Sequence, residues 1–178
     1  MRKALVLFTL LALGIPAAGA AAPSADDGTL SVEDGRGKVS IDARGAVIGR
    51  LASGTLTIWD LTPEDTSLPV VWGDDLPVRL VGETGVRYSG TGMRFRVIGG
   101  RYRIVISGRG IDLSAVAKGW ASLRAELGAF DPGIYSVDGA DCSSIREVAS
   151  CKPLPELERR FTLGSLQAER NLIRPTTG

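Results

Sequence analysis

Apolar and polar residues alternate with a period of two over most of the chain between residues 29 and 124. This period is typical of β-strands that bury one face. Glycine-containing turn signals interrupt the alternation about every 8–12 residues. The pattern predicts an all-β, antiparallel fold of roughly ten short strands, arranged as a β-sandwich or a barrel. A β-solenoid is the alternative, but its strands run parallel, whereas tight turns favour antiparallel hairpins.

Three hairpins are predicted from turns that place apolar side chains on one face. A turn at Gly35-Arg36 pairs Val32 with Val39 and Leu30 with Ile41. A turn at Ser53-Gly54 sets Leu51 against Leu56. A turn at Gly99-Gly100 pairs Val97 with Tyr102, Phe95 with Ile104 and Met93 with Ile106.

Part of this pattern occurs twice. Residues 28–58 align without a gap on residues 93–123, and the matches fall at turns and at core-facing positions. Identical pairs include Gly35 with Gly100 and Gly54 with Gly119. We therefore predict an internal duplication of a four-stranded meander. The register stays open at the turns Arg44-Gly45 and Arg109-Gly110, where either Asp112 or Leu113 faces the core and a bulge fits near Asp112.

Between the copies, three prolines indicate a loop, followed by short strands near residues 78–81 and 86–88. Further strands are expected at residues 134–137 and around 159–163. Residues 21–166 are thus expected to form a single β domain, and residues 167–178 a flexible tail.

The N-terminus has the layout of a secretory signal peptide. Arg2 and Lys3 precede an apolar run, and small residues follow it. Cleavage is expected after Ala20 or Ala22, which makes residues 1–20 the signal segment. The expected location is therefore secreted or extracytoplasmic, with no membrane span after cleavage. In an oxidising compartment Cys142 and Cys151 are expected to form a structural disulfide.

Composition excludes several kinds of chemistry. The 178-residue chain contains no histidine, so Ser-His-Asp, Cys-His and His-ligated metal sites are ruled out. Two cysteines cannot form a Cys₄ zinc site, and the formal net charge of +1 argues against nucleic acid as the main partner. No metal, no cofactor and no catalytic residue is expected.

Two sets of residues are candidate binding sites. Arginines on the polar face of the third hairpin would bind an anionic polymer: Arg94, Arg96, Arg101 and Arg103. In that register Arg96 lies directly opposite Arg103, a repulsion that an anion would relieve. Trp59 and Trp120 lie near the ends of the repeated segments and would stack on sugar rings if exposed.

The segments Gly54-Thr55-Leu56-Thr57-Ile58 and Arg109-Gly110-Ile111-Asp112-Leu113 resemble those of small secreted all-β bacterial proteins rich in arginine, alanine and glycine. The resemblance implies an exported β domain and assigns no function to any residue. The sequence therefore favours an exported, non-catalytic binding or structural protein. Its expected partner is an anionic cell-envelope polymer or another secreted protein. The alternatives are a carbohydrate-binding module and, third, a hydrolase that uses carboxylates.

Overall fold

The fold is a single antiparallel β-sheet dominated by two very long strands. The computed structural model describes residues 26–65, 67–74, 76–139, 141–142 and 151–164. The strands are β1 (Gly28–Asp60), β2 (Val70–Trp72), β3 (Val78–Val81), β4 (Gly85–Ala125), β5 (Ile134–Val137), β6 (Lys152–Pro153) and β7 (Arg159–Leu163). All seven pair in one sheet, and every pairing is antiparallel.

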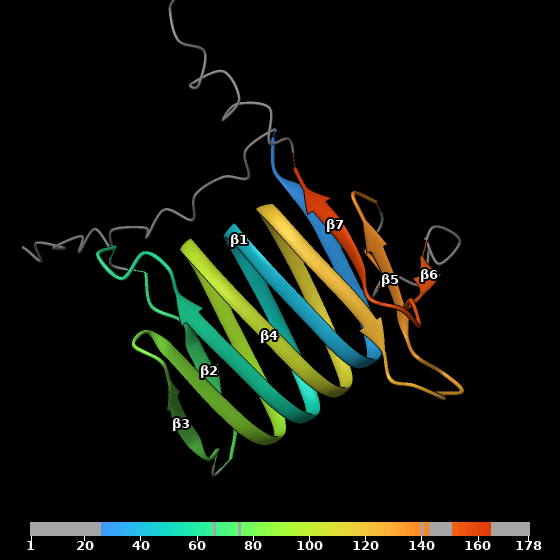
Figure 1. Ribbon diagram of the computed structural model, residues 1–178, viewed down its shortest axis with the longest axis horizontal. Helices are drawn as coiled ribbons and strands as arrows, with labels where there is room; N and C mark the ends of the chain where they lie inside the picture. The colour runs from blue at the N-terminus through green and yellow to red at the C-terminus, as the bar shows by residue number, and fades with distance from the viewer. Residues whose placement is uncertain (1–25, 66, 75, 140, 143–150, 165–178) are drawn as a thin grey trace, which may run out of the picture.

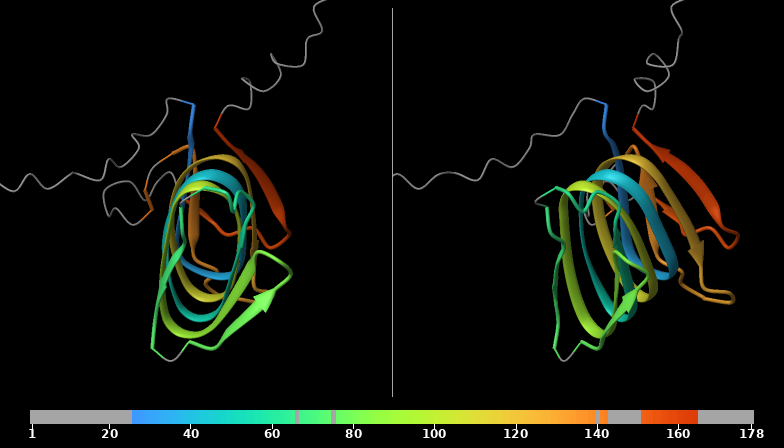
Figure 2. Two further views of the ribbon diagram at one scale, coloured as in Figure 1. Left: turned by 90° about the vertical axis from the view of Figure 1, so that its left-hand side faces the viewer. Right: turned by 60° about the vertical axis from the view of Figure 1, so that its left-hand side comes forward.

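Strands β1 and β4 wind together into a coil. Val39 of β1 pairs with Ile106 on one side and with Leu123 on the other, so the two neighbours of one residue lie 17 positions apart on β4. The antiparallel pair therefore returns to stack on itself after each turn (Figure 1). Seen along its axis the coil is a flattened tube with two broad walls and two narrow edges (Figure 2).

The inside of the tube is the hydrophobic core. Side chains from both walls meet there and are almost completely buried, including Val39, Ile41, Leu56, Phe95, Ile104, Ile106, Ile111 and Leu123. Because successive side chains of a strand point to opposite faces, the alternating pattern fills the interior and leaves the polar residues outside. Every apolar residue assigned to the faces of the three predicted hairpins is buried.

The predicted hairpins themselves are wrong. The chain runs on through Gly35-Arg36, Ser53-Gly54 and Gly99-Gly100 as continuous strand. Val32 pairs with Leu113 instead of Val39, and Phe95 pairs with Gly49 instead of Ile104. A corner and a hairpin turn both bring the flanking apolar side chains to one face, so the local pattern does not distinguish them.

Glycines form the edges of the tube. At one edge Gly90, Gly54, Gly108 and Gly37 are successive neighbours across the strands. The φ angles of Gly54 and Gly108 are 143° and 154°, a region that essentially only glycine adopts. A Cβ on Gly108 would lie 2.1 Å from the carbonyl oxygen of Ser53, and one on Gly54 would lie 2.1 Å from that of Ser107. The edge thus needs glycine both for its φ angle and for the close approach of neighbouring backbones.

The broader architecture agrees with the sequence only in part. The all-β, antiparallel class is confirmed, as are the strands at residues 78–81, 134–137 and 159–163. The ten separate strands and the sandwich or closed barrel are not confirmed, because one strand passes through several predicted turns and the sheet is an open coil. Each copy of the predicted four-stranded meander is one continuous stretch of strand.

The duplication stays a prediction, although the register is compatible with it. Val39 and Ile41 align with Ile104 and Ile106 in the sequence comparison, and the structure pairs Val39 with Ile106 and Ile41 with Ile104. This cross-pairing is that of two antiparallel copies related by a two-fold axis at the Ser40–Val105 pair. The open registers are also resolved: Val47, Leu51 and Leu113 face the core, Asp112 faces outward, and the register is irregular beside Gly110.

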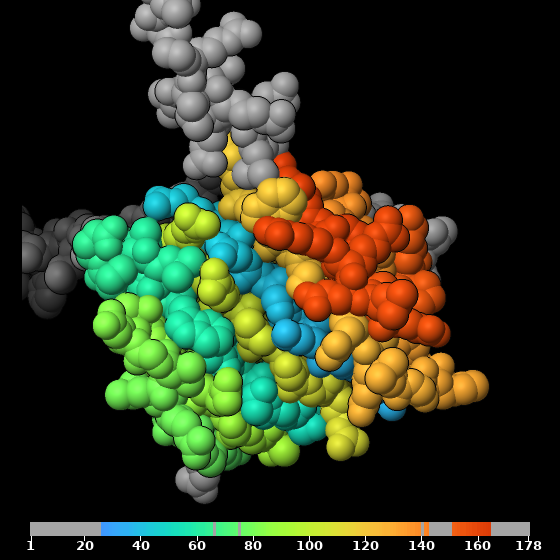
Figure 3. Space-filling view, viewed as in Figure 1, coloured from blue at the N-terminus to red at the C-terminus, as the bar shows by residue number. Residues whose placement is uncertain are grey.

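Short strands complete the two ends of the coil. Strands β2 and β3 extend β4 at one end, while β5, β6 and β7 cover the other (Figure 3). The predicted disulfide between Cys142 and Cys151 is confirmed and lies at this second end. No helix of the described residues is long and apolar enough to cross a membrane. The predicted signal segment and the tail at residues 167–178 lie outside the described residues.

The glycine edge gives a direct test of the fold. Gly108→Ala is expected to lower the free energy of unfolding by about 3 kcal/mol, because it combines backbone strain with a clash against Ser53. Gly82→Ala is the matched control: its φ is 68°, but nothing lies within 4 Å of the added Cβ. The control is expected to lose about 1 kcal/mol. Urea unfolding followed by circular dichroism measures both, and equal losses would contradict the edge model.

Candidate functional site

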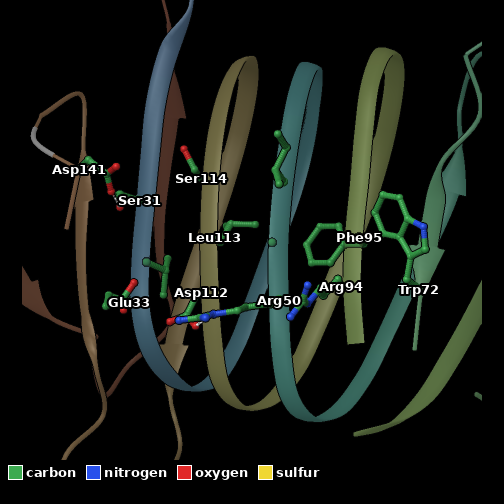
Figure 4. Close-up of a pocket in the computed structure, with 13 residues that line it drawn as sticks. Ser31, Glu33, Arg50, Trp72, Arg94, Phe95, Asp112, Leu113, Ser114 and Asp141 are labelled. Carbon is green, nitrogen blue, oxygen red and sulfur yellow. Dashed lines mark hydrogen bonds and ion pairs between the residues drawn. The ribbon is translucent and has the colours of Figure 1, made fainter. Parts of the chain in front are cut away.

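An open groove of about 980 Å³ runs across one broad wall of the tube. Its floor is a row of outward side chains from adjacent strands. Trp72 of β2 pairs with Arg94 of β4, Arg94 pairs with Arg50 of β1, and Arg50 pairs with Asp112 of β4. Glu33 follows on the first turn of β1, next to Asp112 (Figure 4). We call these five residues the groove row.

The groove row is ordered by chemistry. It begins with an aromatic side chain, continues with two arginines and ends with two carboxylates. Three strands cross the row five times, and this spacing of about 4.8 Å gives the row a length of about 19 Å. A second row lies one pleat further along the strands and includes Arg96, Ile48, Ser114 and Ser31. The groove can therefore accept an extended ligand that crosses the strands.

Trp72 is a half-exposed aromatic platform, with 49% of its surface accessible. The residues that precede β2 form hydrogen bonds with one another and with Tyr102 of β4. Thr62 Oγ1 donates to Asp65 Oδ2 at 2.8 Å, and Ser67 N donates to Asp65 Oδ1 at 2.9 Å. These bonds lower the pKa of Asp65. The Tyr102 hydroxyl donates to the carbonyl oxygen of Ser67. Burial, together with nearby aspartates, raises the pKa of Tyr102 to about 12, so this donor stays protonated.

The acidic end of the groove holds two carboxylates in different environments. Asp112 accepts hydrogen bonds from the backbone N of Asp34 at 2.8 Å and from Nε of Arg50. The hydrogen bond and charge of Asp112 raise the pKa of Arg50. Burial raises the pKa of Glu33, and the neighbouring charge of Asp112 adds to this effect, with Arg50 opposing it.

The region beside the disulfide completes this end. Ser31 Oγ donates to Asp141 Oδ1 at 3.1 Å and accepts from the backbone N of Cys142 at 3.0 Å. Ser31 is buried by this contact. The Cys142–Cys151 disulfide therefore lies next to Ser31, which lines the groove.

The predicted arginine face is divided between two walls. Arg94 lines the groove and Arg96 pairs with Ile48 on the same wall. Arg101 and Arg103 come after the Gly99-Gly100 corner and lie on the opposite wall. There both arginines bind Asp42, at 3.2 and 3.1 Å. The predicted repulsion between Arg96 and Arg103 does not occur, because the strand turns a corner instead of reversing.

The two predicted tryptophans are poor platforms. Trp59 is half-buried, and its ring occupies the space that a Cβ on Gly85 would fill, at 2.5 Å. Trp120 is 37% exposed, but the guanidinium of Arg160 covers its ring at 4.3 Å. Trp120 lines a second, smaller hollow of about 550 Å³ on the opposite wall, with Arg103 and Glu158.

Sequence reasoning missed Trp72, Arg50, Glu33 and Asp112 as site residues. Trp72 ends a Val-Val-Trp run directly after Pro69, and this β-prone run was the available signal. The other three residues are separated by up to 79 positions and come together only through the coil. No group of three or more metal-binding side chains occurs among the residues that the structure describes.

The pKa of Glu33 predicts how stability depends on pH. The pKa of Glu33 is higher in the folded chain than its ordinary value of 4.5, so ionisation of Glu33 lowers the free energy of unfolding. This loss of stability is absent below pH 4.5 and is complete once the pH has risen through the pKa of the folded chain. Glu33→Gln is therefore expected to gain stability relative to the native chain between acidic and neutral pH. Thermal unfolding at a series of pH values measures the difference.

Asp112→Asn supplies the control for this prediction. In the Asp112→Asn variant the charge that helps to raise the pKa of Glu33 is gone, and Arg50 has lost its carboxylate partner. The pH-dependent gain in stability from adding Glu33→Gln is therefore expected to be smaller. A gain that does not vary with pH in the native background would contradict the assignment.

Comparison of the chain with protein-family models, with curated proteins and with solved structures gave no match.

Proposed function

We propose that the protein is an exported binding protein that holds a saccharide chain of the cell envelope in the groove. The observation that carries the proposal is the half-exposed Trp72 at one end of an open groove whose floor is rich in hydrogen-bonding side chains. Sugar rings stack on aromatic faces through their apolar C–H surfaces, while their hydroxyls need polar partners at the sides. The groove offers both in one row.

The surroundings favour binding of an extended chain over a small molecule. The groove is open, and a row of about 19 Å exceeds the size of one sugar ring. Its floor consists of paired strands, which keep Trp72, Arg50 and Asp112 at fixed spacings. A rigid floor reduces the entropy lost on binding. The disulfide and the absence of a membrane-spanning helix among the described residues are compatible with an extracellular location.

Replacement of the platform tests the proposal. Trp72→Ala is expected to weaken binding to insoluble envelope glycans by about tenfold, because it removes the stacking surface. Co-sedimentation with purified peptidoglycan and with xylan measures the loss. Trp120→Ala on the opposite wall is the matched control and is expected to bind like the native chain. Equal binding by native chain and Trp72→Ala, or none by the native chain, would refute the proposal.

A hydrolase that uses carboxylates is the second candidate, because Glu33 and Asp112 lie side by side in one groove and the pKa of Glu33 is raised. Glu33 would protonate the leaving glycosidic oxygen, and water would attack the sugar carbon and release its proton to solvent. The test is incubation with the bound glycan and measurement of new reducing ends. If the native chain releases reducing ends and Glu33→Gln abolishes this release but still binds the glycan, the hydrolase is favoured. If no reducing ends are released, the binding function remains.

A further inference from the structure

Arg94 and Arg96 differ from Arg50, Arg101 and Arg103 in their ion pairing. Arg50 binds Asp112, and Arg101 and Arg103 bind Asp42. Both Arg94 and Arg96 are exposed, and neither forms an ion pair with a carboxylate within the described ranges. Two guanidinium groups thus stand next to each other on β4 with their charges uncompensated.

These two arginines lie beside the aromatic platform. Arg94 is the cross-strand neighbour of Trp72, and Arg96 is the neighbour of Val70 on the same strand β2. A sugar stacked on Trp72 would therefore lie next to the two positions of β4 from which Arg94 and Arg96 project. Guanidinium binds carboxylate and phosphate through paired N–H donors, which suits an anion held at the side of a ring.

The other end of the groove has the opposite charge. Glu33 and Asp141 lie there, and the charge of Asp112 is offset by Arg50. An anion placed at this end would contact carboxylates at a distance shorter than the Debye length of about 8 Å, so salt would not screen the repulsion. A uniformly charged polyanion is therefore disfavoured along the full groove.

We infer that the groove binds a saccharide chain with an acidic sugar at one position and neutral sugars beyond it. The acidic sugar stacks on Trp72 with its anion on Arg94 and Arg96, and the neutral sugars extend past Ile48 and Ser114 toward Glu33. The inference rests on the proposed saccharide-binding function and adds the class and direction of the ligand.

Three oligosaccharides of equal length test the inference by calorimetric titration of the native chain at low salt. The probes are neutral xylotetraose, xylotriose capped with one glucuronate, and tetragalacturonate. The capped probe is expected to bind about tenfold more tightly than the neutral one, the gain of one charge-assisted contact. It is also expected to bind more tightly than tetragalacturonate, which places carboxylates against Glu33.

Variants assign the effect to residues. Arg94→Gln with Arg96→Gln is expected to abolish the preference, so that the capped probe and xylotetraose bind this variant with equal affinity. Arg79→Gln with Arg124→Gln, at two exposed positions outside the groove, is the charge-matched control and is expected to retain the preference. Circular dichroism confirms that each variant is folded.

The outcomes separate the two proposals. Equal binding of the capped and neutral probes, with both lost in Trp72→Ala, would overturn the inference and keep the saccharide-binding function. Tightest binding of tetragalacturonate would also overturn it, in favour of a polyanion. Binding of no probe, or binding that Trp72→Ala leaves intact, would overturn both.

Discussion

The close approach of backbones at the glycine edge is the constraint on which the rest of the structure depends. Two strands of 33 and 41 residues can stack on themselves only if they bend sharply at regular intervals without losing their hydrogen bonds. At Gly54 and Gly108 the bend uses φ angles that a side chain would oppose, and the neighbouring carbonyl oxygens occupy the space of a Cβ. The edge glycines convert what would be a long two-stranded ribbon into a tube that encloses its own core.

The coil also determines what the outer surface can do. The two cross-strand neighbours of one residue lie about 17 positions apart in the sequence. A row of side chains across a wall therefore contains residues that are far apart along the chain. The groove row is formed in this way from Glu33, Arg50, Asp112, Arg94 and Trp72. Since the row lies on a sheet with a packed interior, its spacing is set by strand geometry and not by loops. Along the groove row the side chains therefore change from aromatic to basic to acidic.

The two walls differ because the same kinds of residues meet different neighbours. Arg103 meets Asp42 and forms an ion pair, whereas Arg94 meets Arg50, which Asp112 already binds. Trp120 is covered by Arg160 from β7, whereas Trp72 lies on β2, the last strand of its wall, and is left half-exposed. The groove wall thus combines a half-exposed tryptophan with an arginine that forms no ion pair within the described residues.

The sequence by itself determined the secondary-structure class, the buried face and the disulfide. Alternation with a period of two assigns each side chain to the inside or the outside, and Val39, Phe95 and Leu123 obey it whatever strand they pair with. The turn glycines were also visible in the sequence, but their role was not. A hairpin and a corner satisfy the same local pattern, and only the long-range partner of each strand distinguishes them. Tertiary structure therefore decided that Arg94 and Arg103 lie on opposite walls, and that Trp72 meets arginines and carboxylates distant in sequence. The physical reason is that strand pairing is a non-local interaction, whereas hydrophobic alternation is a property of the local chain.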